Sequence, residues 1–312
     1  MSELLKPEQK KRKFSLFDNF VTISITAFLM IFAGQLLGFV LQIFCLVPAM
    51  EAMIPGVSAT DAWITSEIYL AFLGIWVVAM LLIVLIPRNR NMLKALCRKT
   101  KGNTPKMFAV GLAIGLGMNL FCALVAILNG DISLRFYAFR PVTFLLVFVA
   151  VLIQSAAEEL VCRVFMYQRL VRRYGKPALA TVINAAFFAL LHLGNDGITT
   201  LAVLNIFIYG LLFSAMVIYM DSPWAAMGAH ASWNFCQNII LGLPNSGIVL
   251  PYSVFKLDAA SAADSFAYST SFGLEGTITA SITLFAVAGV IAWWGIKHKV
   301  VPTNIWDTAV QS

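Results

Sequence analysis

The chain has 312 residues, of which 60% are hydrophobic and 12% are charged, and its mean hydropathy is +0.84. Soluble domains carry roughly 25% charged residues, so this composition excludes an ordinary soluble enzyme and favours a protein that lies in lipid. The net charge of +7 does not indicate nucleic-acid binding, because the Lys and Arg residues cluster beside apolar segments, where membrane topology and anionic lipid explain them.

The chain begins with a basic segment, which we expect to form a cytoplasmic tail over residues 1–18. An apolar stretch follows over 20–47. A cleaved signal sequence has an apolar core of roughly 7 to 15 residues, so this longer stretch is predicted to remain as the first membrane span.

Further apolar runs predict spans near 68–87, 108–128, 141–167, 178–194, 198–220, 223–243 and 276–296. The polar connections between them are short, so the sequence predicts an all-α fold. We expect one polytopic bundle of about eight transmembrane helices over residues 19–300, followed by a cytoplasmic tail over 301–312. The longest connection, 244–275, contains an Ala- and Ser-rich run and is predicted to be a flexible external loop.

The distribution of positive charge gives the orientation of these spans. Most of the 22 Lys and Arg residues lie in the N-terminal tail, in the connections 88–106 and 169–176, or after the last span. Arg135, Arg140 and Lys256 fall on the opposite side. Because positive charge accumulates on the cytoplasmic side, both termini are predicted to be cytoplasmic.

Three charged residues lie inside the fourth predicted span, where each costs roughly 2.5 to 3.5 kcal/mol unless it is paired or functional. Glu159 and Arg163 are four residues apart and share a helix face, which predicts an ion pair. A buried structural pair is the simplest interpretation of these two residues. Glu158 points about 100° away and has no local cation, so it is a candidate proton acceptor or donor.

Further polar residues occur in the predicted spans. His192 lies in the fifth, and His230 and Asn234 lie four residues apart in the seventh, with Asn238 continuing the same stripe. Such residues can simply form hydrogen bonds between helices, but a stripe of them also suits a polar cavity. At 1.5 Å per residue, Glu158, His192 and His230 lie about 10 to 21 Å from the cytoplasmic ends of their spans, so they can meet at one site.

Three sequence blocks carry these residues: Glu158-Glu159-x-x-x-Arg163, Phe188-x-x-x-His192 and His230-x-x-x-Asn234. In this order, on separate helices, they resemble the signature motifs of the CPBP intramembrane proteases. This family, also called Abi, includes the type II CAAX prenyl endopeptidases. The resemblance implies a protease core at about 141–243 and a multi-pass protein of the bacterial cell membrane.

The resemblance also implies roles for the residues that match. Glu158 and His192 would activate a water molecule, while His230 and Asn234 would polarise the peptide carbonyl and stabilise the oxyanion. Glu159, Arg163 and Phe188 would support the site. These roles agree with the chemistry, because a buried carboxylate can take a proton and buried donors can stabilise negative charge.

The resemblance leaves the type of peptidase open between a glutamate-type enzyme and a metalloprotease. The chain lacks the HExxH motif, in which two His residues bind zinc from one helix. If zinc takes part, Glu158, His192 and His230 would be its ligands, a set that catalytic zinc accepts. We favour direct activation of water by Glu158 and His192, with no certain cofactor.

The expected function is therefore an intramembrane endopeptidase that acts on a membrane-embedded or lipidated peptide or protein. Two other functions fit the same residues. Intramembrane Glu, His and Asn side chains also serve in proton-coupled transporters, although the chain has no internal repeat. A noncatalytic immunity or scaffold protein could bind a peptide in the same groove.

Overall fold

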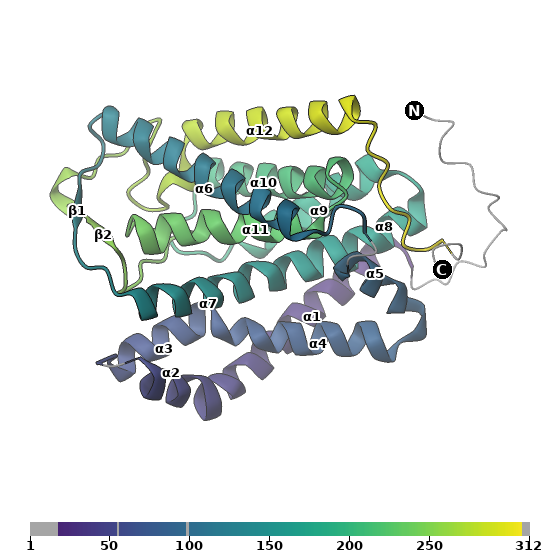
Figure 1. Ribbon diagram of the computed structural model, residues 1–312, viewed down its shortest axis with the longest axis horizontal. Helices are drawn as coiled ribbons and strands as arrows, with labels where there is room; N and C mark the ends of the chain where they lie inside the picture. Colours follow the sequence, from purple (N-terminus) through teal and green to yellow (C-terminus); the bar gives the residue numbers. More distant parts are fainter. Residues whose placement is uncertain (1–17, 55, 98–99, 308–312) are drawn as a thin grey trace.

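The computed structural model describes residues 18–54, 56–97 and 100–307, which form a bundle of long helices (Figure 1). The predicted N-terminal tail lies almost wholly outside these residues, as does the end of the predicted C-terminal tail. Within the described part, α-helices dominate and β-structure is limited to one pair of short strands. The predicted all-α fold is confirmed.

The α-helices are α1 (Phe20–Leu41), α2 (Val47–Met53), α3 (Ala59–Ile68), α4 (Leu73–Leu85), α5 (Leu93–Leu96), α6 (Pro105–Leu128), α7 (Pro141–Glu159), α8 (Tyr167–Tyr174), α9 (Pro177–Leu191), α10 (Thr200–Tyr219), α11 (Pro223–Phe235) and α12 (Ile278–Lys297). The π-helical turns η1 (Gln42–Leu46), η4 (Leu160–Met166) and η5 (Cys236–Ile240) extend α1, α7 and α11. The 3-10 turns are η2 (Leu70–Phe72), η3 (Pro87–Met92), η6 (Ala259–Ser261) and η7 (Leu274–Gly276). Strands β1 (Leu134–Phe136) and β2 (Phe255–Leu257) pair antiparallel, with Arg135 opposite Lys256.

Among the described residues, five helices are long and apolar enough to cross a membrane: Phe20–Met53, Pro105–Leu128, Pro141–Tyr174, Thr200–Tyr219 and Ile278–Lys297. The segments Ala59–Ile68 and Leu70–Leu85, bent by 42°, make a sixth candidate if they count as one span. Each predicted span contains a helix, but α9 and α11 are shorter than these candidates. A total of eight crossings therefore stays a prediction.

The outer surface of the bundle is apolar where lipid would contact it. Phe32 and Leu36 on α1 and Phe285 and Trp293 on α12 are more than half exposed. A soluble protein rarely exposes contiguous apolar faces of this kind. The exposed faces of α1 and α12 thus support an integral membrane protein.

Both described ends of the chain lie at the same end of the bundle. Asp18 forms an ion pair with Arg169, and the indole of Trp306 donates to the carbonyl of Gln168. These contacts hold both ends beside α8, and Figure 1 shows the β1–β2 pair at the opposite end. This arrangement agrees with termini on one side of the membrane, while the assignment of that side to the cytoplasm is a prediction.

The segment 244–275, which is predicted to be external and is called the external segment below, differs from the flexible loop that its composition predicts. Its backbone is fixed to the bundle, because Val254 N–H donates to Ile239 O and Asp258 N–H donates to Ser133 O. Strand β2, which lies in this segment, pairs with β1. Buried backbone N–H and C=O groups need hydrogen-bond partners, and these contacts with distant parts of the chain supply them.

Helix α11 lies at the centre of the bundle, in contact with α6, α7 and α10. All of its residues except Trp224 are buried. Glycines on α6 allow a very close approach: a Cβ atom at Gly115 would lie 2.0 Å from the carbonyl oxygen of Ala229, and one at Gly111 would lie 2.2 Å from that of Ala225. Small residues commonly let membrane helices pack in this way.

We expect Gly115→Ala to destabilise the protein by about 1–3 kcal/mol or more, because the added methyl group forces α11 away from α6. Gly117→Ala is the matched control on the same helix, since a Cβ atom there meets nothing within 4 Å. Thermal unfolding of both variants in detergent would test this. Equal melting temperatures for Gly115→Ala and the wild type would contradict the close packing.

The orientation can be tested with single cysteines in a background that lacks the five native ones. Ala263, in the external segment, and Lys176, before α9, are both exposed. We expect Ala263→Cys to react with an impermeant thiol reagent in intact cells, and Lys176→Cys to react only after lysis. The reverse labelling pattern would show that the predicted orientation is wrong.

Candidate active site

Glu158 lies in the last turn of α7, next to α11. Its Oε1 accepts a hydrogen bond of 2.7 Å from Nε2 of Gln154, one helical turn earlier. Its Oε2 lies 3.8 Å from Nε2 of His230. The residue that the sequence left without a local cation therefore has an imidazole from another helix beside its second oxygen.

Glu159 and Arg163 form the ion pair that their spacing predicts. Arg163 Nη1 lies 3.1 Å from Oε1 of Glu159, and neither side chain is exposed. The guanidinium also donates to the carbonyl of Gly210 and lies over the Phe188 ring, 4.6 Å from its centroid. Arg163 thus joins α7, α9 and α10 through one buried charge.

His230 lies between the two carboxylates. Its Nδ1 is 3.1 Å from Oε1 of Glu159, and its Nε2 faces Glu158. The ring stacks on Phe213 with centroids 5.1 Å apart. These contacts fix the plane of the imidazole and leave its Nε2 edge at the cavity beside Glu158.

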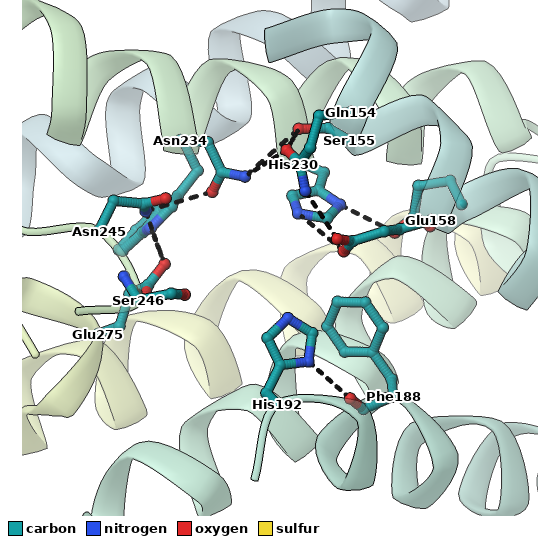
Figure 2. A network of polar contacts seen from close by, with 12 residues as sticks. Gln154, Ser155, Glu158, Phe188, His192, His230, Asn234, Asn245, Ser246 and Glu275 are labelled. Atoms are coloured by element: carbon teal, nitrogen blue, oxygen red, sulfur yellow. Dashed lines mark hydrogen bonds and ion pairs between the residues drawn. The ribbon is translucent and has the colours of Figure 1, made fainter. Parts of the chain in front are cut away.

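His192 caps the C-terminus of α9. Its Nδ1 lies 2.8 Å from the carbonyl oxygen of Phe188, which can only accept a hydrogen bond. The proton of the neutral ring is therefore on Nδ1, and Nε2 keeps a free lone pair. Figure 2 shows Nε2 on the side of the ring turned away from Phe188, toward the other polar residues of the site.

Asn234 continues the polar face of α11 one turn after His230. Its Nδ2 donates to Oε1 of Gln154 at 3.2 Å and to Oγ of Ser155 at 3.3 Å. Its Oδ1 accepts a hydrogen bond of 3.3 Å from Asn245. Gln154 therefore connects the amide of Asn234 with the carboxylate of Glu158.

Glu158, His192, His230 and Asn234 line one cavity of about 400 Å³. These side chains come from α7, α11 and the end of α9. The apolar part of the lining, called the apolar wall below, includes Ile31, Phe72, Ile75 and Ile206. The sequence predicts that the polar residues meet, and the structure brings them together around this space; their chemical roles are a separate question.

Several residues of the site are not predicted from the sequence, namely Gln154, Ser155, Asn245, Ser246 and Glu275. Glu275 comes from the end of the external segment and is 5% exposed. Burial raises the pKa of its carboxyl group, while hydrogen bonds from Ser246 and the nearby His192 ring act in the opposite direction. A carboxylate just before a span is typical of the membrane surface, so no local pattern indicated that it turns inward.

If zinc takes part, its predicted ligands are Glu158, His192 and His230. Within the part of the chain that the structure describes, no group of three or more His, Cys, Asp or Glu side chains is placed to hold a metal ion. Both ring nitrogens of His230 face carboxylates, and Nδ1 of His192 is bound to a backbone carbonyl. The choice between a glutamate-type enzyme and a metalloprotease stays a prediction.

A scan against protein-family models matches the type II CAAX prenyl endopeptidase Rce1-like family over residues 140–236. The match supports the CPBP/CAAX protease family for this segment, which is called the family segment below. Comparisons with curated proteins and with solved structures found no match. The family segment contains Glu158, His192, His230 and Asn234, together with the Glu159–Arg163 pair, and the match supports a CAAX-type intramembrane protease in general. Asn245 and Glu275 lie outside it.

We expect Arg163→Ala to lower the yield and melting temperature of the CAAX protease fold, because it leaves Glu159 buried without its cation. Breaking a buried pair in this way costs roughly 3–5 kcal/mol. Glu159→Gln combined with Arg163→Met should recover much of that stability, since it removes both charges. Activity should recover less than stability does, because Glu159 also binds His230.

Thermal unfolding and cleavage assays on the same preparations would separate the two effects. A normal melting temperature for Arg163→Ala would show that the pair does not hold the helices together.

Proposed function

We propose that this protein is an intramembrane endopeptidase that hydrolyses a peptide bond of a membrane-embedded or lipidated substrate. The observation that carries the proposal is the convergence of Glu158, His192, His230 and Asn234 on one cavity. Hydrolysis needs a base, a water molecule and oxyanion donors within reach of one carbonyl group. These side chains would supply the base and the donors.

In the proposed reaction, water enters between Glu158 and His192. Glu158 accepts one proton from the water while Nε2 of His192 accepts a hydrogen bond from its other hydrogen and orients it. The water oxygen forms a bond to the carbonyl carbon of the substrate. Its position is fixed before the attack, which removes part of the entropic barrier.

The negative charge that develops on the carbonyl oxygen needs donors. Asn234 can supply an N–H group, and His230, whose Nδ1–H is directed at Glu159, can supply one from Nε2 in its protonated form. The two residues lie on adjacent turns of α11, in a site where little water competes. Asn234 would exchange its long bonds to Gln154 and Ser155 for the stronger interaction with the oxyanion. When the C–N bond breaks, Glu158 returns its proton to the leaving amine.

The surroundings of the polar groups suit a substrate that is apolar or carries a lipid. The apolar wall of the cavity is formed by side chains of α1, η2, α4 and α10. A substrate segment can lie on this wall with its scissile bond toward α7 and α11. Burial of apolar area in the cavity would contribute to binding without adding polar contacts.

The decisive variant is Glu158→Gln, which keeps the shape of the side chain and removes the base. We expect a folded protein that still binds peptide and whose cleavage rate is reduced at least about 10²-fold. Peptide mass spectrometry on membranes containing each variant would identify the peptides that are no longer cut.

Glu67→Gln is the matched control, because Glu67 also borders the cavity but is exposed on α3. It should retain activity within a few-fold of the wild type. Undiminished cleavage by Glu158→Gln would reject the proposed reaction and favour a binding or transport function.

A further inference from the structure

Glu275 is a buried carboxylate that contributes to the site from outside the family segment. Its Oε1 accepts hydrogen bonds from Nε1 of Trp233 at 3.1 Å and from Nδ2 of Asn245 at 3.0 Å. Its Oε2 accepts from the backbone N–H of Ser246 at 2.9 Å and from the hydroxyl of Ser246 at 2.8 Å. A carboxylate offers about four acceptor positions, so these donors occupy Glu275 fully and hold it in one orientation.

Asn245 connects this carboxylate with the proposed oxyanion donor. Its Nδ2 group lies 3.0 Å from Oε1 of Glu275 and 3.3 Å from Oδ1 of Asn234. The group carries two hydrogens, one for each acceptor. Because Glu275 in its ionised form can only accept, the amide of Asn245 must turn its nitrogen, and not its oxygen, toward both partners.

Asn245 fixes the amide of Asn234 from its oxygen side, while Gln154 and Ser155 accept from its nitrogen on the other side. A side-chain amide can rotate by half a turn and exchange its oxygen with its nitrogen at little steric cost. With Asn245 donating to its oxygen, Asn234 directs its N–H groups toward α7, on the Glu158 side of the cavity (Figure 2). The reversed amide would instead present an oxygen to the developing oxyanion and repel it.

Glu275 is itself held in place by contacts with α10, with α11 and within the external segment. Asn205 on α10 donates to the backbone carbonyls of Glu275 and Thr277, at 2.7 and 2.8 Å. Trp233, which donates to Glu275, directly precedes Asn234 on α11. The external segment, α10 and α11 are thereby fixed to one another at the side of the cavity that Glu275 borders.

We propose that Glu275 and Asn245 are positioning residues that fix the amide of Asn234 with its N–H groups toward the reacting carbonyl. This inference rests on the proposed function, because it gives Asn234 the role of oxyanion donor. Both residues border the cavity, but the proposal gives them no contact with the reacting carbonyl. Their effect is transmitted through the hydrogen bond from Asn245 to Asn234.

The test is a double-mutant cycle on the cleavage rate, with a peptide that the wild type cuts and Glu158→Gln does not. Asn245→Ala should lower kcat about 10-fold and leave KM within about two-fold, because a misoriented donor loses part of an interaction worth roughly 10²–10³ in rate. In an Asn234→Ala background, the same change should have almost no further effect on kcat.

Asn238→Ala is the matched control. Asn238 also ties the external segment to α11, through its bond of 2.7 Å to the carbonyl of Ile248, but no bond joins it to Asn234 among the described residues. Its effect should therefore multiply with that of Asn234→Ala. A general loosening of the segment would make Asn245→Ala behave like this control.

Glu275→Gln provides a second approach, since its amide would face the N–H of Ser246 and disturb the same chain of bonds. We expect it to reproduce the kcat defect, again only while Asn234 is present. Effects of Asn245→Ala and Asn234→Ala that multiply would overturn the inference, even if Glu275→Gln failed to fold. Failure of the proposed function is a different result, visible beforehand as cleavage that survives Glu158→Gln.

Discussion

Two adjacent carboxylates in the interior of the helical bundle impose the constraint on which the site depends. Glu158 and Glu159 cannot share one partner, because their side chains leave α7 about 100° apart and their like charges repel. Glu159 takes the guanidinium of Arg163, while Glu158 takes the amide of Gln154. His230 then lies between the two carboxylates, so α7 and α11 must cross at this level.

That crossing requires α11 to be a central helix. A helix with no lipid-facing side can carry polar residues whose partners all come from protein. The glycines of α6 let α11 approach on one side, and α7 and α10 pack against its other sides. The polar residues of α11 consequently meet α7 and the external segment, which together satisfy His230, Asn234 and Asn238.

The contacts that the sequence could predict are those set by helical geometry. The pair Glu159–Arg163 and the stripe His230–Asn234 follow from a spacing of four residues, and apolar runs of sufficient length gave the helices. The contact between Glu159 and His230 joins residues 71 apart in the chain, and no local pattern encodes it. It could only be inferred indirectly, from the high cost of leaving each polar group without a partner.

The external segment also forms contacts that no local sequence pattern predicts. Its Ala and Ser residues are typical of a loop, and Glu275 resembles a solvated charge at a membrane boundary. Burial of Glu275 becomes favourable only when Trp233, Asn245 and Ser246 are brought to it by the fold. Composition gives no information about such an arrangement, since each donor alone is an ordinary polar residue.

Different parts of the chain supply the polar groups of the site and the contacts that shape the cavity around them. The family segment carries Glu158, His192, His230 and Asn234, on helices held by Arg163 and by the packing of α11. The apolar wall includes Ile31 of α1, Phe72 of η2 and Ile75 of α4, and the segment before α12 holds the amide of Asn234 through Asn245. Without that segment, the amide of Asn234 would keep only its bonds to Gln154 and Ser155. The polar groups of the family segment thus depend on the rest of the chain for the shape of the cavity and for the orientation of Asn234.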